Sequence, residues 1–270
     1  MNSTHPTSEM VRDVAPSAII QLKDLTVVYG SGVGAVTALD SLNLDIREGE
    51  FFAILGPSGC GKSTLLKVLS GLLDATSGAA FVGGKKVDGP NSEVGLVFQA
   101  PTLLPWMTIR ENVSLPGKIL KIDPSIISKR ADDALKLVGL ANFADSYPNQ
   151  LSGGMAQRAG IARGLVQDAD VMLMDEPFGA LDAMTRERMN LDLLDIWSKS
   201  RKTIVFITHS IGEAILLADR VALISPRPGR LFDVVDIDLP RPRKIEMMST
   251  PEFGKYTSQF RDYFRKLGEL

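Results

Sequence analysis

The sequence predicts an α/β fold in which helices cover a parallel β-sheet. Short apolar, β-rich runs alternate with patterns of helical periodicity, which is typical of a parallel sheet with helical crossovers. These runs lie at 51–55, 94–98, 171–174, 203–207 and 221–224. Two runs end in polar motifs, GPSGCGKST and DEP. Because open α/β sheets bind ligands at the carboxyl ends of their strands, these motifs mark the expected site.

Between the second and third runs the strand pattern stops, and the segment 125–138 has apolar residues at helical spacing. We therefore expect a helical subdomain over 99–168, inserted into a core formed by 19–98 and 169–240. The segment PRPRK interrupts regular structure after residue 240, and 253–267 resembles an amphipathic helix within a C-terminal extension, 241–270. Residues 1–18 lack the apolar core of a signal peptide and are expected to form a flexible tail.

Composition restricts the function classes. The chain of 270 residues is 44% hydrophobic and carries a formal charge of −2, with both signs interspersed, so it has no electrostatic footprint for nucleic acid. The single cysteine, Cys60, excludes an intrachain disulfide and indicates a reducing, cytosolic setting. The longest uncharged run, Val94–Ile109, is shorter than the ~20 apolar residues that span a bilayer. A membrane role would therefore need a partner.

The segment GPSGCGKST matches the phosphate-loop pattern GxxxxGK[ST] between a strand and a helical run. Its glycines let backbone N–H groups surround phosphate oxygens, and the helix N-terminus adds positive charge. Lys62 would reach the β- and γ-phosphates of ATP, and Ser63 would hold Mg²⁺. An ordinary glycine-rich turn would not need this flanking strand and helix. The residues expected to bind the nucleotide are Gly56, Pro57, Ser58, Gly59, Cys60, Gly61, Lys62, Ser63 and Thr64. Cys60 fits as a small residue better than as a reactive thiol.

The apolar run VMLM ends in Asp175 and Glu176. One carboxylate at such a strand end can bind Mg²⁺, and its neighbour can activate the attacking water. The alternative, two solvated acids opening a turn before Pro177, is disfavoured by the upstream phosphate loop. The two motifs together indicate a P-loop NTPase, a class that includes kinases, GTPases and helicases.

The motif LSGGM at 151–155 narrows this class, because the sequence around it resembles the ABC (ATP-binding cassette) ATPases. A serine and two glycines at a helix start, here Ser152, Gly153 and Gly154, form a second anion site in a chain with one phosphate loop. In the family this signature closes over ATP bound to the other subunit. The resemblance, from about residue 19 to 240, implies a P-loop NTPase (RecA-like) core with a mixed β-sheet and an inserted helical subdomain.

Four further positions match family elements in order. The resemblance implies that Gln99 contacts Mg²⁺ or the attacking water, that Asp182 lies in the D-loop at the dimer seam, that His209 contacts the γ-phosphate, and that Tyr29 stacks on adenine. Singly, Gln99 could be a polar loop residue, His209 a helix cap and Tyr29 a core aromatic. The implied catalytic residues are Lys62, Gln99, Glu176 and His209, and the implied Mg²⁺ ligands are Ser63, Gln99 and Asp175.

Three positions depart from the family pattern. Ala156 follows the signature where relatives usually carry Arg, Gln or Lys. Gly160 and Gly164 replace better helix formers, at an expected cost of ~1 kcal/mol each relative to alanine. These departures concern the stability of the signature helix and its coupling, because the phosphate-facing residues are intact.

Among ABC proteins, the sequence favours a transporter motor. The short separation of Lys62 and Asp175 leaves no room for the coiled coil of SMC-like DNA proteins. The chain also lacks the zinc-binding cysteines of excision-repair relatives and the second cassette that translation-associated members usually carry. The segments FQAPTLLPWMTIRENV and SPRPGRLFDVVDIDLPRPR resemble the nitrate, sulfonate and taurine importer group, including its relatives for thiamine-precursor pyrimidines. The alternative is a subunit of another ABC system, an exporter or a non-transport ATPase.

This resemblance implies the partners. They are a second ATPase subunit, as a homodimer, an integral membrane permease and, indirectly, a solute-binding protein. The implied location is the cytoplasmic face of the bacterial inner membrane, as a peripheral protein. The apolar, proline-flanked stretch 103–107 is expected to line the groove that receives a permease helix, with core packing as the alternative.

Overall fold

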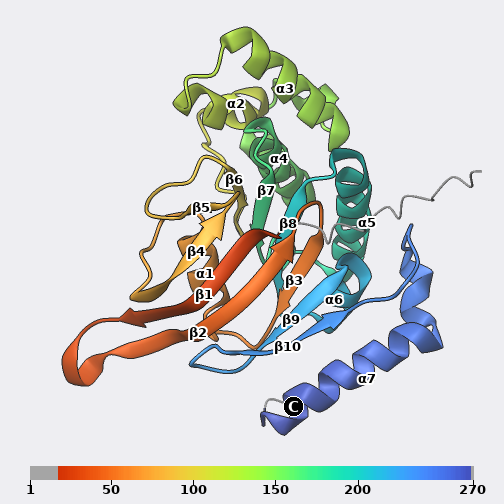
Figure 1. The fold of residues 1–270 in the computed structure, drawn as a ribbon. Helices are drawn as coiled ribbons and strands as arrows, with labels where there is room; N and C mark the ends of the chain where they lie inside the picture. Colours follow the sequence, from red (N-terminus) through yellow and green to blue (C-terminus); the bar gives the residue numbers. More distant parts are fainter. Residues whose placement is uncertain (1–17, 269–270) are drawn as a thin grey trace, which may run out of the picture.

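Two β-sheets form the frame of the molecule in the computed structural model, which describes residues 18–268 (Figure 1). The first sheet is antiparallel and has the order β2 (Val36–Arg47), β1 (Ala18–Tyr29), β4 (Ser77–Val82) and β5 (Lys85–Lys86). The second has the order β10 (Leu231–Asp236), β9 (Arg220–Ile224), β3 (Phe51–Leu55), β8 (Thr203–Thr208), β7 (Val171–Asp175) and β6 (Val94–Val97). Only the β10–β9 pair of this second sheet is antiparallel, so the predicted mixed sheet is confirmed.

The five predicted apolar runs all form strands of the second sheet, within one residue of their predicted ends. The strands β1, β2, β4, β5 and β10 were not predicted. In β2 the buried residues Leu42, Leu44 and Ile46 alternate with exposed polar ones. A sheet with one solvated face produces this alternation, whereas a search for continuous apolar runs detects only strands that are buried on both faces.

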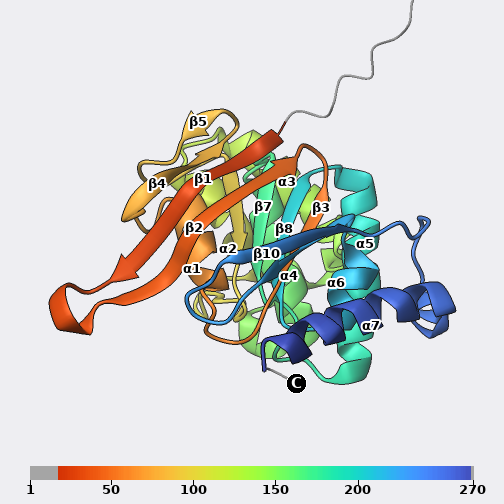
Figure 2. The same ribbon diagram turned by 60° about the horizontal axis from the view of Figure 1, so that its bottom comes forward.

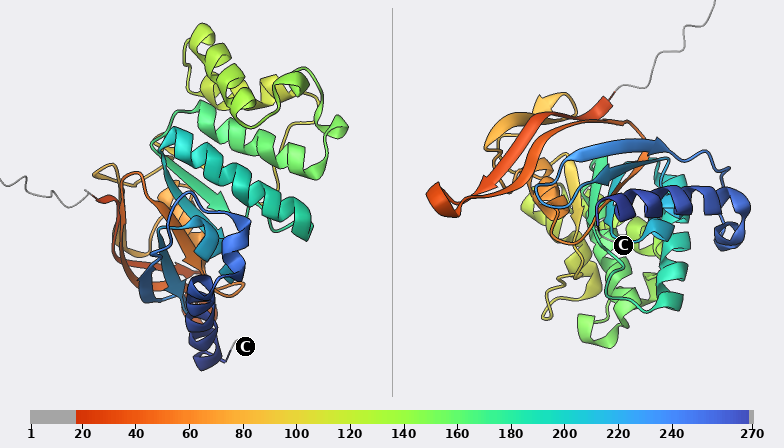
Figure 3. Two further views of the ribbon diagram at one scale, coloured as in Figure 1. Left: turned by 90° about the vertical axis from the view of Figure 1, so that its right-hand side faces the viewer. Right: turned by 90° about the horizontal axis from the view of Figure 1, so that it is seen from below.

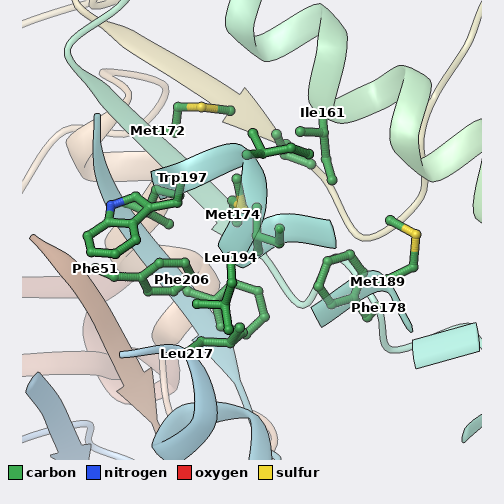
Figure 4. Packing of buried hydrophobic residues seen from close by; sticks show 14 of the residues in the cluster. Phe51, Ile161, Met172, Met174, Phe178, Met189, Leu194, Trp197, Phe206 and Leu217 are labelled. Carbon is green, nitrogen blue, oxygen red and sulfur yellow. The ribbon is translucent and has the colours of Figure 1, made fainter. Parts of the chain in front are cut away.

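Helix α1 (Lys62–Leu69) lies between the two sheets (Figure 1). Its Leu65 and Leu66 join a hydrophobic cluster that includes Phe52 and Ile54 of β3. Alternate residues of the same strand, among them Phe51, face a second cluster formed with α5 (Ala183–Ser200) and α6 (Ile211–Leu217). Figure 4 shows this second cluster, in which the rings of Phe51 and Trp197 lie 5.8 Å apart. The central strand is therefore buried on both faces.

Three helices lie between β6 and β7 in the sequence: α2 (Ile109–Ile119), α3 (Pro124–Leu137) and α4 (Gly153–Val166). Figure 3 shows α2 and α3 at one end of the molecule, with α4 alongside α5. Residues 18–268 also contain four short 3-10 helices: Gly32–Gly34, Ala141–Phe143, Pro148–Gln150 and Ile245–Ser249. Apolar residues of α2, α3 and α4 share one cluster with the second sheet, so the boundaries of a subdomain at 99–168 remain a prediction.

The two unusual glycines of α4 differ in their surroundings. A Cβ added to Gly164 would lie 3.1 Å from Met172 Cε and 3.3 Å from Val97 Cγ2, because α4 packs closely on β6 and β7. A Cβ on Gly160 would meet Pro101 at 3.6 Å, an ordinary van der Waals contact. Close packing therefore accounts for Gly164, and nothing in the structure explains Gly160.

The C-terminal extension is packed on the core and ends in helix α7 (Pro251–Lys266) (Figure 2). Phe253, Phe260 and Phe264 of α7 are buried. The extension is also anchored by Arg243, whose buried guanidinium donates hydrogen bonds to carbonyl oxygens at the end of α6, including that of Ile215 at 2.9 Å. Strand β1 begins at Ala18, so the predicted tail lies outside the described residues except for its last position. Within 18–268, every helix is too short or too polar to cross a bilayer.

Candidate active site

A pocket of about 410 Å³ opens at the carboxyl ends of β3 and β7. It is called the P-loop pocket below, and its lining residues are Tyr29, Ala38, Ser58, Gly59, Gly61, Lys62, Ser63, Thr64, Gln99, Asp175, Glu176 and Arg227. Parallel strands place their carboxyl ends at one edge of the sheet, which brings the segments after β3 and β7 together. The pocket therefore lies where the two polar motifs predicted a ligand site.

The phosphate loop, residues 56–61, joins β3 to α1. Gly61 precedes the helix with φ of 102°, a left-handed conformation that favours glycine, and a Cβ there would lie 2.6 Å from the carbonyl oxygen of Ala38. The first N–H groups of α1 have no partner within the helix, and the helix dipole adds partial positive charge at this end. The start of α1 at the P-loop pocket is thus suited to an anion such as phosphate.

Lys62 supplies a positive charge at this site although it is only 5% exposed. Its Nζ donates hydrogen bonds to the carbonyl oxygens of Gly56 at 2.7 Å and Pro57 at 2.8 Å. The same nitrogen lies 4.0 Å from Glu176 Oε1. The loop carbonyls and the carboxylate together compensate the buried ammonium group.

Two oxygen-bearing side chains meet between the two motifs. Ser63 Oγ donates a hydrogen bond of 3.0 Å to Asp175 Oδ1. Burial raises the pKa of Asp175, and the hydrogen bond from Ser63 opposes that shift. Gln99 lines the same pocket. Hydroxyl, carboxylate and amide oxygens are ligands that suit Mg²⁺, so the three predicted metal-binding residues have the appropriate chemistry.

Glu176 and His209 follow neighbouring strands, β7 and β8. A hydrogen bond of 2.9 Å joins His209 Nδ1 to Glu176 Oε2. Glu176 has φ of 42°, which directs the chain away from the sheet after Asp175, and its N–H donates to the carbonyl oxygen of Ile207. The residue that caps α6 is Ser210, so His209 is not the helix cap. This arrangement places a carboxylate beside the phosphate loop with an imidazole to orient it.

Cys60 is the predicted loop residue whose side chain turns away from the pocket. It is 1% exposed and belongs to the cluster between the two sheets. Burial raises the pKa of the Cys60 thiol, so the neutral form is favoured. These observations agree with the interpretation of Cys60 as a small residue that fits, and they leave only its backbone for contact with a ligand.

Tyr29, the last residue of β1, lies at the rim of the P-loop pocket. It is 41% exposed, which contradicts the alternative of a core aromatic. Its hydroxyl group shares a hydrogen bond of 3.2 Å with Thr64 Oγ1 at the start of α1. A partly exposed ring in this place is available to stack on a base.

Seven predicted nucleotide-binding residues do not line the P-loop pocket. Gly56, Pro57 and Cys60 belong to the phosphate loop itself, whereas Ser152, Gly153, Gly154 and Asp182 lie at the starts of two other helices. Ser152 caps α4, since its hydroxyl oxygen accepts from the N–H of Met155 at 3.3 Å. Asp182 caps α5 by accepting from the N–H of Thr185 at 3.0 Å, and this hydrogen bonding lowers the pKa of Asp182. A Cβ on Gly153 would lie 3.8 Å from Leu181, so the two helix starts are neighbours. The exposed residues Ser152, Gly153 and Asp182 form a surface separate from the pocket, whereas Gly154 is buried.

Two residues of the P-loop pocket, Ala38 and Arg227, were not predicted as site residues. Ala38 lies on β2, a strand in which buried and exposed residues alternate, so that it forms no continuous apolar run. Arg227 lies in the segment SPRPGR, part of the stretch that resembles the importer group. The sequence feature that could have indicated Arg227 as a site residue is its place in a proline- and glycine-rich loop directly after a predicted strand.

Comparisons with known proteins agree with this geometry. The family described as ABC transporter matches residues 39–179. A nitrate import ATP-binding protein of Synechocystis sp. is 43% identical over 255 residues, covering 91% of this chain and 95% of that protein. A taurine import ATP-binding protein of Pelagibacter ubique is 46% identical over 210 residues, covering 77% and 79%. The solved dimeric, post-hydrolysis state of an ATP-binding cassette bound to ADP and phosphate is 34% identical with a TM-score of 0.70, covering 82% of this chain and 100% of that one.

Proposed function

Because the chain belongs to the ATP-binding subunits of the ABC transporter family, we propose that it is the ATP-hydrolysing motor of a bacterial importer for nitrate, sulfonate, taurine or a related small solute. The observation that supports it most directly is the P-loop pocket, where Lys62, Ser63, Asp175 and Glu176 meet at the start of α1. The importer names of similar proteins support the transport direction and solute class.

In the proposed reaction, Lys62 and the N–H groups of the phosphate loop bind the β- and γ-phosphates of ATP. Glu176 accepts a proton from the attacking water, and His209 orients its carboxylate through the 2.9 Å hydrogen bond. Contact of His209 with the γ-phosphate is also part of the proposal. Ser63, Gln99 and Asp175 would hold Mg²⁺, which neutralises charge on phosphate oxygens when bound.

We further propose that two copies of the chain form a homodimer around two ATP molecules. The surface formed by the starts of α4 and α5 includes the helix start predicted as an anion site, and it lies outside the chain's own P-loop pocket. In a dimer, Ser152 of one subunit would close the pocket of the other, with Asp182 at the seam. The dimeric state of a similar cassette supports this arrangement.

Mixing two inactive variants tests the dimer. Lys62→Ala damages the phosphate loop and Ser152→Arg damages the signature. If both motifs act on one nucleotide from different subunits, a mixed dimer has one site with both lesions and one intact site. We expect subunit exchange to restore nucleotide trapping above that of either variant alone. Mixed dimers that trap no nucleotide would contradict the assignment of Ser152 to the partner's site.

The proposed contact with the permease lies in the stretch 103–107, which follows β6 and Gln99. Trp106 is 70% exposed, which argues against core packing for this side chain. The buried Asn112 holds the stretch in place, because its side chain accepts from the N–H of Leu104 at 2.7 Å and donates to the carbonyl oxygen of Met107 at 3.0 Å. An exposed indole on a backbone that is held in place is a suitable anchor for an apolar partner helix.

This contact would place the subunit peripherally on the cytoplasmic face of the inner membrane, with the solute-binding protein acting through the permease. Trp106→Ser should reduce co-purification with the co-expressed permease while sparing the basal ATPase activity of the isolated chain. Leu72→Ser, at another exposed apolar residue next to α1, serves as the matched control. Equal permease recovery for Trp106→Ser and the wild-type chain would exclude this contact.

A further inference from the structure

The loop between β9 and β10, residues 225–230, packs against the phosphate loop (Figures 1 and 2). A Cβ on Gly229 would lie 2.1 Å from the carbonyl oxygen of Cys60, so the two backbones are in direct contact there. Arg227 donates hydrogen bonds to the carbonyl oxygen of Gly59 from Nε at 3.3 Å and from Nη2 at 3.1 Å. The loop thus lies along one side of the expected phosphate site.

This loop is held on both sides. Across its neck, the N–H of Ser225 donates to the carbonyl oxygen of Arg230, and the N–H of Arg230 donates to Ser225 Oγ, each at 3.0 Å. Gly229 exchanges backbone hydrogen bonds with β2, to Ala38 at 2.9 Å and from Asp40 at 3.0 Å. Arg230 is ion-paired with Asp40 through Nε at 2.9 Å and Nη2 at 2.6 Å. The position of Arg227 is therefore set by the fold.

The guanidinium groups of Arg227 and Arg230 have different partners. Arg230 is neutralised by Asp40, whereas within 18–268 no carboxylate lies within ion-pair distance of the Arg227 guanidinium. Arg227 lines the P-loop pocket together with Lys62, and it is exposed where Lys62 is buried. A guanidinium has five N–H donors in a planar fork, more than the Gly59 carbonyl oxygen can accept.

We propose that Arg227 is a further nucleotide-binding residue, which donates hydrogen bonds to phosphate oxygens of ATP from the solvent side of the pocket. This inference rests on the proposed ATP site and adds a contact to it. The guanidinium carries a permanent charge and matches phosphate geometry, so Arg227 and Lys62 would hold the phosphates from opposite sides, one exposed and one buried. The contact to Gly59 keeps the fork directed toward the phosphate loop.

Equilibrium binding of Mg-ATP and Mg-ADP to the purified chain tests this contact. We expect Arg227→Ala to raise the Kd for both nucleotides by about 5–20-fold, the range for one charge-assisted contact that is partly open to solvent. The salt dependence of log Kd should become shallower, because one charge no longer contacts the phosphates. Arg261→Ala, which removes an exposed arginine of α7 that does not line the pocket, should leave the Kd unchanged.

Two conservative variants separate phosphate binding from mere support of the phosphate loop. Arg227→Gln keeps a neutral donor for the Gly59 carbonyl oxygen, and Arg227→Lys keeps the charge. If Arg227 contacts phosphate, the Arg227→Gln variant should bind both nucleotides as weakly as Arg227→Ala, and Arg227→Lys should have an intermediate affinity. If Gln restores wild-type affinity, or if the salt dependence does not change in the Ala variant, the proposal is overturned and Arg227 only supports Gly59.

Thermal unfolding without nucleotide should show that all four variants are folded, since Arg227 is exposed. Wild-type affinity in a folded Arg227→Ala chain would overturn this inference alone. Failure of the wild-type chain to bind Mg-ATP would overturn the proposed function and this inference with it. The two failures are therefore distinguishable.

Discussion

Replacing Glu176 with glutamine should separate ATP binding from ATP hydrolysis. The substitution keeps the shape of the side chain and an oxygen that can accept from His209, but it removes the negative charge and the ability to take a proton. We expect turnover to fall by about 10²–10⁴, the usual contribution of a positioned general base. This loss corresponds to about 3–5 kcal/mol of transition-state stabilisation.

The same change should strengthen ATP binding. Glu176 Oε1 lies 4.0 Å from Lys62 Nζ, and the Glu176 side chain is 20% exposed. Two unit charges at about this distance interact by up to ~4 kcal/mol at the effective dielectric constant typical near a protein surface, and solvent reduces that value here. Loss of the carboxylate frees Lys62 for the phosphates and removes repulsion of the γ-phosphate. We expect the Kd for ATP to fall by about 3–10-fold, which corresponds to part of this interaction.

Single-turnover release of phosphate and a fluorescence titration of ATP measure the two quantities separately. Dimer accumulation in ATP, followed by light scattering, should increase because closure of the proposed dimer would precede the chemical step. Glu252→Gln, an exposed glutamate in the first turn of α7, removes the same charge elsewhere and should change neither quantity. Wild-type turnover in Glu176→Gln would refute the assignment of Glu176 as the base.

Three further predictions concern the structure around the site. Arg243→Met should lower the free energy of unfolding by about 3 kcal/mol in urea titrations, because buried carbonyl oxygens at the end of α6 lose their donor. Arg241→Met, at a more exposed arginine, should lower it by about 1 kcal/mol, and equal losses would contradict the anchoring role of Arg243. Gly160→Ala should stabilise the chain by about 0.5–1 kcal/mol, since helix propensity improves and the new Cβ has room. Gly164→Ala should stabilise it less, or destabilise it, because the new Cβ would contact β6 and β7, and the reverse order of stabilities in thermal unfolding would refute this packing argument. The Cys60 thiol, with a pKa raised by burial, should react with a thiol reagent at pH 8 far more slowly in the native chain than in urea, and similar rates would show that the loop opens.

The sequence by itself determined the parts of this protein that depend on contiguous residues. The phosphate loop and the start of α1 are encoded in nine consecutive positions, GPSGCGKST, whose glycines and helix context are local properties. Five strands of the second sheet, all except β10, were predictable because burial on both faces requires uninterrupted apolar residues, as in β3. The helix predicted at 125–138 forms at Pro124–Leu137 because its apolar spacing and its Asp123 cap are also local.

Only the tertiary structure decided how these parts meet. Strands β7 and β8 are neighbours in the sheet, and this order brings His209 into contact with Glu176. The two residues are far apart in the sequence, and a local sequence pattern does not predict their contact. The antiparallel strands carry polar residues on their solvated face, so β1 and β2, with Tyr29 and Ala38 at the P-loop pocket, were not visible as apolar runs. Arg227 reaches this pocket because backbone hydrogen bonds to β2 fix its loop, and such hydrogen bonds depend little on residue type. Local chemistry is set by neighbouring residues, whereas the partners of a side chain are set by the order in which distant strands pair.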